Sequence, residues 1–211
     1  MKIVDCEQRT PEWFEARLGK PSSSSFEKLI TPTGKPVTSA KSETYINTLI
    51  AEKLTGKKEE THVSQWMQRG IDLEPQARSD YEFLKNCVVE EVGFCLHDDI
   101  DCGCSPDGLV VKGENKTLVG NWWRGVEIKC PAPTTHASYL IDHESLVKKY
   151  YPQVQGCMWI TDLASWDLFS FNPEMKHVLV NVKRDDDYIQ KLETEVHKAV
   201  DIIKREVERL Q

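Results

Sequence analysis

The fold of this chain is decided by two blocks of sequence: Cys-Ser-Pro-Asp-Gly at residues 104–108 and Val-Glu-Ile-Lys-Cys at residues 126–130. The second block predicts a β-strand, in which alternate side chains share a face. Glu127 and Lys129 therefore project to the same side. If Asp107 begins the partner strand of a hairpin, its carboxylate meets Glu127 next to Lys129.

Two carboxylates and a lysine that a hairpin brings together suit metal-assisted hydrolysis. Carboxylate oxygens favour Mg²⁺ or Mn²⁺, and a cation held by Asp107 and Glu127 would activate water and neutralise a leaving oxyanion of a phosphodiester. Lys129 would orient that water or stabilise developing charge. The plainer alternative is a solvated charge pair on a strand, with Pro106 and Gly108 as ordinary turn residues.

The surrounding pattern predicts a mixed α/β or α+β fold. Strands are expected where β-branched residues alternate, and helices where apolar residues recur at helical spacing. The expected strands are 88–94, 108–111, 119–129, 165–171 and 177–182, with a turn at 113–116. The expected helices are 24–30, 45–54, 74–85, 145–161 and 185–211. Ser24 and Glu27 fit a capping box at the start of the first helix.

Composition limits the class of protein. The chain has 211 residues, 39% of them hydrophobic, which is enough for one core, so a single domain over residues 1–211 is expected. The net charge is −7, and residues 61–107 hold 3 basic and 10 acidic side chains. With no apolar run of about 18 residues and no signal-like start, we expect a cytoplasmic protein without a membrane partner.

The cysteines are expected to be free thiols, since the predicted compartment is reducing. The chain has 7 of them, an odd number. Cys102 and Cys104 near His97 form an alternative zinc pattern. That pattern lacks the second cysteine pair that a zinc finger needs, so buried thiols are the preferred interpretation.

The two blocks, taken together, resemble the PD-(D/E)xK nuclease motif, and their flanks are similar to the phage lambda exonuclease family, also called YqaJ-like viral recombinases. The resemblance extends from about Gln8 to Lys183. Its matching blocks are residues 12–19, 69–74, 77–78, 104–109, 127–131, 153–155 and 158–159. The resemblance implies a restriction-endonuclease-like core with a central mixed β-sheet flanked by helices.

The resemblance also implies a catalytic set. Asp107, Glu127 and the main-chain carbonyl of Ile128 would hold the metal, with Lys129 as the catalytic lysine. Glu74 matches an additional acidic residue near the metal, although a solvated helical glutamate is the plainer alternative. Gln153 matches a helix that touches the scissile region.

A second set would bind DNA. Arg17 and Ser24 match a pocket for a terminal 5′ phosphate, and an arginine fork beside the free N–H groups of a helix start does suit an anion. Trp13 matches a tryptophan near this pocket, and Tyr150 accompanies Gln153. The alternatives are an N-cap role for Ser24, a core position for Trp13 and simple helix packing for Tyr150.

The activity that this resemblance implies is a Mg²⁺-dependent 5′-to-3′ exonuclease. It would degrade one strand of linear double-stranded DNA from a 5′-phosphorylated end and leave 3′ overhangs for recombination by strand annealing. Mn²⁺ is a possible substitute. A homotrimeric ring around DNA, a single-strand annealing recombinase as partner and a phage or prophage origin are implied as well. Lys28, Lys35 and Lys41 are candidates for backbone contacts.

Two other functions stay open. The first is a PD-(D/E)xK endonuclease, restriction-like or structure-specific, that uses the same metal residues. The second is a catalytically silent DNA-binding module of the same fold. Trp122 and Trp123 match no block of the family, and strand packing, a subunit contact and a DNA contact are equally open for them.

Overall fold

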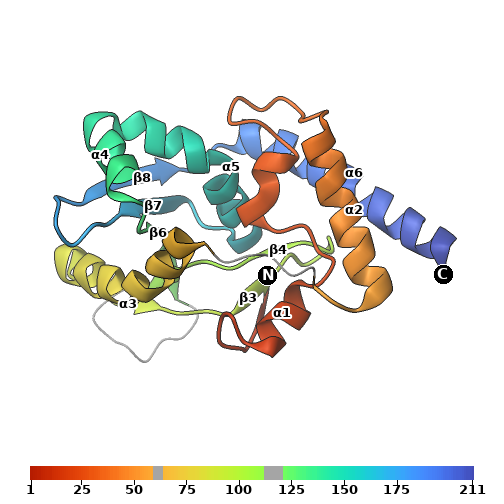
Figure 1. Ribbon diagram of the computed structural model, residues 1–211, viewed down its shortest axis with the longest axis horizontal. Helices are drawn as coiled ribbons and strands as arrows, with labels where there is room; N and C mark the ends of the chain where they lie inside the picture. Colours follow the sequence, from red (N-terminus) through yellow and green to blue (C-terminus); the bar gives the residue numbers. More distant parts are fainter. Residues whose placement is uncertain (59–63, 112–120) are drawn as a thin grey trace.

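The computed structural model describes residues 1–58, 64–111 and 121–211, which form helices and two β-sheets (Figure 1). The helices are α1 (Pro11–Arg17), the 3-10 helix η1 (Ser23–Lys28), α2 (Ala40–Thr55), α3 (Gln65–Lys85), α4 (Pro133–Ile141), α5 (His143–Thr161) and α6 (Asp186–Leu210). The strands are β1 (Lys2–Val4), β2 (Val89–Glu90), β3 (Phe94–Leu96), β4 (Gly103–Cys104), β5 (Gly108–Val111), β6 (Trp122–Lys129), β7 (Ser165–Ser170) and β8 (Val178–Lys183).

The larger sheet contains the strands of both sequence blocks, in the order β2-β5-β6-β7-β8. Strands β6 and β7 are parallel, and the other neighbouring pairs are antiparallel. The smaller sheet has the order β1-β3-β4. A mixed sheet flanked by helices confirms the predicted fold class, and β5 and β6 are the antiparallel pair expected of the hairpin.

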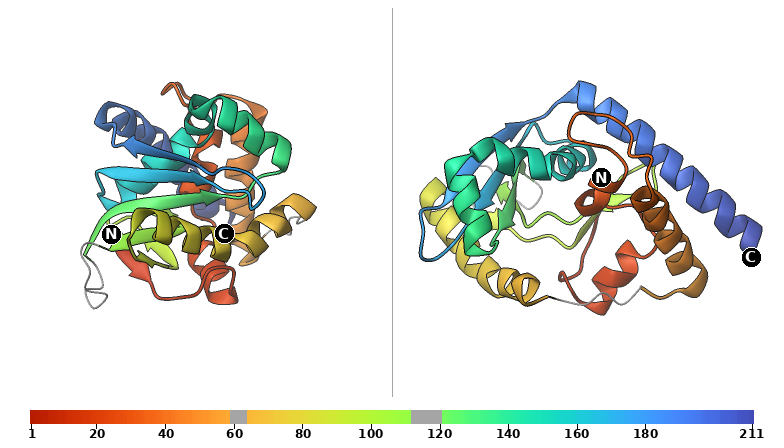
Figure 2. Two further views of the ribbon diagram at one scale, coloured as in Figure 1. Left: turned by 90° about the vertical axis from the view of Figure 1, so that its left-hand side faces the viewer. Right: turned by 45° about the horizontal axis from the view of Figure 1, so that its top comes forward.

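Helices cover both faces of the larger sheet. Helix α5 contacts β6, β7 and β8 on one face and reaches β3 and β4 of the smaller sheet, and its residues 154–161 are all buried. Helix α3 lies against the opposite face, where Ala77 and Tyr81 pack with Val126 and Phe169. The left view of Figure 2 shows the strands between these helix layers. The alternation along β6 thus gives each layer its own set of side chains.

The C-terminal helix α6 packs along α2 (Figure 1). One stripe of α6 is buried, consisting of Tyr188, Ile189, Leu192, Val196, Ala199 and Ile203. Burial of one aliphatic side chain contributes about 1.5–3 kcal/mol, so this stripe fixes the helix in place. The end of α6 projects beyond the rest of the molecule in the right view of Figure 2.

The predicted capping box at residues 24–30 is wrong. The segment is the 3-10 helix η1, whose N-cap is Ser22, and no side chain caps it. Its backbone bonds span three residues, as in Ser25 N–H to Ser22 O at 2.8 Å. Because Ser24 has no capping role, its hydroxyl is available to another residue.

The single strand predicted over residues 88–94 is also wrong. Of these residues, only Val89, Glu90 and Phe94 lie in strands, and these strands, β2 and β3, belong to different sheets. The chain turns at Gly93, where a Cβ atom would lie 2.3 Å from the carbonyl oxygen of Cys6. The close approach of these two backbone segments requires glycine, and the sequence alone does not reveal it.

Other predicted boundaries shift less. Helix α3 begins at Gln65 and continues through Pro75, whereas the prediction began it at Glu74. Helices α1 and α4 were not predicted: α1 has only 7 residues and none is buried, so it carries no apolar stripe. The predicted turn at 113–116 and the beginning of the predicted strand 119–129 lie outside the described residues.

Several isolated sequence features now have a structural place. Trp122 is partly buried and donates from Nε1 to Glu90 Oε2 at 2.6 Å, whereas Trp123 is exposed and stacks on the guanidinium of Arg124. All 7 cysteines are free. Within the described ranges, no helix has the length and apolar character needed to span a membrane.

Candidate active site

The hairpin register places Asp107 across from Glu127. Gly108, the first residue of β5, pairs with Val126 of β6. Asp107, which directly precedes β5, therefore lies opposite Glu127, the next residue of β6. The Asp107 carboxylate accepts the main-chain N–H of Ile128 at 2.7 Å. The carboxylates that the sequence predicted to converge therefore share one end of the hairpin.

Glu127 is the most enclosed carboxylate of this site, with 1% of its side chain exposed. Its Oε1 accepts the Lys129 ammonium and the Nε2 of Gln153, the latter at 2.6 Å. Its Oε2 is buried and has no hydrogen-bond partner among the described residues. A buried carboxylate oxygen without a donor is costly unless a cation occupies that side.

Charge is concentrated in this enclosed space. Burial and the neighbouring Glu127 carboxylate raise the pKa of Asp107 well above its ordinary value. Burial alone would lower the pKa of Lys129, but the carboxylates of Glu127 and Asp107 outweigh it and raise that pKa. Lys129 therefore favours its charged form, and Asp107 holds a proton more firmly than a free aspartate does.

Helix α5 supplies the wall next to the lysine. Gln153 reaches Glu127 from this helix, and the Tyr150 ring centroid lies 4.9 Å from the Lys129 ammonium. Both residues of α5 thus contact the predicted Glu127–Lys129 pair.

Glu74 enters the site from α3, but both of its oxygens are occupied. Oε2 pairs with Arg9, and Oε1 accepts from Arg78 at 2.9 Å. Arg9 was not predicted from the sequence, and it has a φ angle of 70°, in the left-handed region that favours glycine. Glu74 thus lines the same cavity as Asp107 while two arginines hold it.

The residues present fit a hard divalent cation. The donors are carboxylate oxygens of Asp107 and Glu127, with Ile128 lining the same cavity, and the unpartnered Glu127 Oε2 is the observation that favours an ion there. In the part of the chain that the structure describes, no group of three or more His, Cys, Asp or Glu side chains is arranged to hold a metal. Glu74, the third carboxylate of this site, is held by two arginines.

A second set of side chains surrounds Arg17 at the end of α1. Among the residues that the structure describes, its guanidinium donates to three neutral hydroxyls, those of Ser105 at 2.8 Å, Ser22 at 3.0 Å and Ser24 at 3.2 Å. The Trp13 ring lies 4.4 Å from the guanidinium carbon, and its Nε1 donates to Ser105 at 2.9 Å. Trp13 therefore forms the wall of this site instead of the core.

The charge of Arg17 is not compensated by an ion pair with any described residue. Burial lowers the pKa of Arg17, but an arginine remains protonated at neutral pH. A partly buried guanidinium among hydroxyl groups has the chemistry of a candidate anion site. Ser24, which does not cap η1, is one of the groups that shape it.

This anion site opens into a cavity of about 630 Å³. The cavity is lined by more cations than carboxylates: the basic residues are Arg17, Lys20, Lys28, Lys41 and Lys58, and the acidic one is Glu52. Lys28 and Lys41 are therefore near the predicted phosphate pocket, whereas Lys35 is not among the lining residues. Lys58 also lines this cavity while its side chain stays exposed.

A second cavity, of about 520 Å³, lies beside Asp107 and Lys129 and is called the catalytic cavity. It adjoins the cavity beside Arg17, since Met67 at the start of α3 lines both. The structure thus places a candidate metal site next to a candidate phosphate site.

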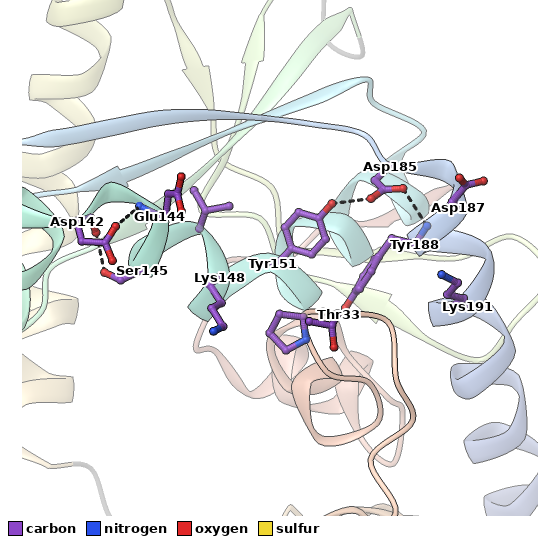
Figure 3. A pocket seen from close by; sticks show the side chains of 12 residues that line it. Thr33, Asp142, Glu144, Ser145, Lys148, Tyr151, Asp185, Asp187, Tyr188 and Lys191 are labelled. Carbon is purple, nitrogen blue, oxygen red and sulfur yellow. Dashed lines mark hydrogen bonds between the residues drawn. The ribbon is translucent and has the colours of Figure 1, made fainter.

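A larger cavity of about 820 Å³ lies between the loop at Thr33 and the beginnings of α5 and α6 (Figure 3). Its carboxylates include Asp142 and Asp185, which are the N-caps of those helices and accept main-chain N–H groups. These charges already have partners. The cavity has the character of a helix-capping region and contains no residue of the catalytic or phosphate set.

Comparisons with known proteins agree with this geometry. The family described as "YqaJ-like viral recombinase domain" matches residues 12–164, which include every residue of the predicted site. No curated protein sequence matches the chain.

Solved structures give the same result. An alkaline exonuclease, LHK-Exo from Laribacter hongkongensis, is 33% identical with a TM-score of 0.81, and the match covers 95% of this chain and 96% of that one. A crystal of LHK-Exo with dAMP gives a TM-score of 0.82 at the same identity and coverage. A phage-related exonuclease from Haemophilus somnus 129PT shares the fold at 16% identity, with a TM-score of 0.68 and coverage of 91% and 96%. This chain belongs to the YqaJ-like viral recombinase family, and it is an enzyme of the nuclease class.

Proposed function

We propose that the chain is a Mg²⁺-dependent 5′-to-3′ exonuclease that degrades one strand of linear double-stranded DNA from a 5′-phosphorylated end. The product would be a 3′ single-stranded overhang for recombination by strand annealing. The observation that carries the proposal is the uncompensated Arg17 guanidinium in a cavity that adjoins the Asp107–Glu127–Lys129 site. A terminal phosphate bound there would place a phosphodiester of the same strand beside Lys129.

The side chains divide the work between the two cavities. Arg17, with the hydroxyls of Ser22, Ser24 and Ser105, binds the terminal phosphate. Asp107, Glu127 and the Ile128 carbonyl would hold Mg²⁺, which supplies water activation and charge neutralisation when bound. Lys129, fixed by Glu127 and next to Tyr150, stabilises the charge that develops on the phosphate. Gln153 keeps the Glu127 carboxylate turned toward the cavity.

The quaternary and cellular parts of the proposal follow the family resemblance. A homotrimeric ring would reconcile the net charge of −7 with DNA binding, because the basic cavity would face an inner channel. A single-strand annealing recombinase is the proposed partner, Mn²⁺ the proposed substitute metal and the cytoplasm of a phage or prophage host the proposed location. Residues 1–211 would act as one nuclease domain.

The test compares three DNA substrates: linear duplex with 5′-phosphate ends, linear duplex with 5′-hydroxyl ends, and closed circular duplex. Each is incubated with Mg²⁺ or with EDTA, using the wild type and Lys129→Ala. We expect degradation of linear DNA only, faster with the phosphate and abolished by EDTA and by the substitution. Nicked circles would instead support an endonuclease, and an absence of product under every condition would support a silent binding module.

A further inference from the structure

Arg9 occupies a backbone position that is unfavourable for arginine. It is the third residue of the turn Glu7–Thr10, closed by the Thr10 N–H to Glu7 O bond at 3.4 Å, and its φ angle is 70°. Turns of this kind favour glycine at that position. A long side chain held in a strained conformation suggests that the side chain itself is required.

The turn is fixed to the catalytic hairpin. The side-chain amide of Gln8 donates to Pro106 O at 2.7 Å and to Val92 O at 2.9 Å. Pro106 directly precedes Asp107, so the position of Arg9 depends on the same backbone that positions this carboxylate. Arg9 lines the catalytic cavity together with Asp107 and Lys129.

The basic side chains that line this cavity differ in the contacts that they make with the protein and in their exposure. Lys129 is held by Glu127, and the Lys149 ammonium lies over the Tyr150 ring. Arg9 has 42% of its side chain exposed and pairs with Glu74. Arg9 and the exposed Lys149 are therefore the lining cations within reach of a DNA phosphate, and of these two only Arg9 forms an ion pair with a carboxylate of the site.

Glu74 does not depend on Arg9 alone. Its other oxygen accepts from Arg78, which is also anchored by Glu91 at 2.7 Å. If Arg9 leaves, Glu74 keeps one arginine partner and turns one oxygen toward the cavity that contains Asp107. The exchange leaves no buried carboxylate without a partner.

We propose that Arg9 is a substrate-positioning residue that pairs with Glu74 in the DNA-free enzyme and moves onto a backbone phosphate of the strand in the catalytic cavity. The inference rests on the proposed function, since it requires duplex ends as the ligand. It assigns to Arg9 a phosphate contact separate from the terminal-phosphate site at Arg17. Glu74 acts in this exchange as the competitor that keeps Arg9 in place until DNA arrives.

The test measures binding instead of hydrolysis. A fluorescein-labelled, blunt, 5′-phosphorylated duplex is titrated with full-length protein in EDTA, and the dissociation constant is followed against salt concentration by fluorescence anisotropy. Arg9→Gly removes the guanidinium while glycine accepts the φ angle of 70°, so the turn is preserved. Asn86→Gly is the matched control, because it relieves a positive φ of 46° at the far end of α3 and touches no residue of the site.

We expect Arg9→Gly to weaken binding about tenfold or more, the effect of one charge-assisted hydrogen bond, and to reduce the salt slope by about 1, for one lost phosphate contact. Arg9→Lys should keep the slope and lose part of the affinity. Glu74→Gln should tighten binding, because the competing charge is gone. Asn86→Gly should match the wild type in both affinity and slope.

The contrary result is an Arg9→Gly protein with the wild-type dissociation constant and salt slope, which would reduce Arg9 to a structural clamp on Glu74. If Glu74→Gln bound DNA as the wild type does, Glu74 would not compete with the DNA phosphate for Arg9, and that part of the proposal would be wrong. A wild type that does not bind duplex ends at all would instead overturn the proposed function. The two failures are therefore distinguishable.

Discussion

Glu127 on β6 and Asp167 on β7 are buried carboxylates on neighbouring strands of the larger sheet. They differ in how many of their oxygens have a hydrogen-bond partner. Each has 1% of its side chain exposed and pairs with a basic residue, Lys129 and Arg124 respectively. They project to opposite faces of the sheet. On one face lies the catalytic cavity, and on the other lies the packing against α3.

Every oxygen of Asp167 has a donor. Oδ1 accepts from Asn181 at 2.6 Å, and Oδ2 accepts from Tyr81 at 2.8 Å and Arg124 at 3.0 Å. Glu127 has Oε2 without a partner among the described residues. Equal burial therefore does not indicate equal role: the satisfied carboxylate is structural, and the unsatisfied one indicates a ligand.

The largest effect is expected at this pair. Glu127→Gln should reduce kcat for linear 5′-phosphorylated duplex on the order of 10³-fold, because the charge that would hold the cation and fix Lys129 is lost. Steady-state rates at saturating DNA and Mg²⁺ measure it. The matched change is Asp167→Asn, which should lower the free energy of unfolding by roughly 3–5 kcal/mol while the folded fraction keeps its kcat. Equal activity losses would contradict the comparison.

The same contrast applies to two arginines. Arg17 forms no ion pair with any described residue and hydrogen-bonds neutral hydroxyls. Arg17→Ala should therefore reduce kcat/KM on 5′-phosphate ends by about tenfold to a hundredfold and hardly change the rate on 5′-hydroxyl ends. Arg184 is satisfied by Asp186 at 2.7 Å and the carbonyl of Met158 at 2.7 Å, which makes Arg184→Ala the control. The measurement is the ratio of the rate on 5′-phosphate ends to the rate on 5′-hydroxyl ends for each variant. If Arg17→Ala left this ratio unchanged, Arg17 would not be the residue that binds the terminal phosphate.

Two glutamines of α5 refine the comparison at a smaller scale. Gln153 donates to Glu127, whereas Gln155, two residues on, bonds the backbone at Lys183 and Asp185. Gln153→Ala should reduce kcat by about tenfold through a less well-oriented Glu127 and leave the thermal midpoint nearly unchanged. Gln155→Ala should lower the thermal midpoint and leave kcat nearly unchanged. Both variants are measured by kinetics and by thermal unfolding, and the comparison would be wrong if Gln155→Ala lowered kcat and Gln153→Ala lowered the thermal midpoint.

Local patterns in the sequence predicted the centre of the site. Strand alternation placed Glu127 and Lys129 on one face, and the hairpin brought Asp107 to them, because both rules depend on residues close in the chain. The prediction of a capping box was wrong because it used local spacing alone. Ser24 and Glu27 have the right spacing, but the segment is a 3-10 helix, and the Ser24 hydroxyl accepts a hydrogen bond from Arg17.

The outer parts of the site depend on long-range contacts that no spacing encodes. Arg9 and Glu74 are 65 residues apart, and Trp13 and Ser105 are 92 apart. The turn that holds Arg9 was hidden because arginine stands where a turn pattern would show glycine. Lys58 follows a helix end and is exposed, and its ammonium also lies 4.2 Å from the centroid of the Phe14 ring, a residue far away in the chain.

The smallest effect is expected in the acidic cavity of Figure 3, where Asp185 caps α6. The N–H of Tyr188 and the hydroxyl of Tyr151 hydrogen-bond its carboxylate and lower its pKa. Asp185→Ala should cost about 1 kcal/mol of stability at neutral pH with no loss of activity, whereas Asp185→Asn, which can still cap the helix, should cost less.

The pH dependence of this cap has a definite sign. A carboxylate whose pKa is lowered by folding contributes stability that is fully present above the unfolded-state value of about 3.9 and is lost as the pH falls through the folded-state value. The difference in thermal midpoint between wild type and Asp185→Ala should therefore shrink as the pH is lowered below about 4. A difference that grows in acid would mean that folding raises the pKa of this carboxyl group instead of lowering it, and a change in nuclease rate at neutral pH would mean that a carboxylate whose hydrogen bonds are satisfied can still be functional.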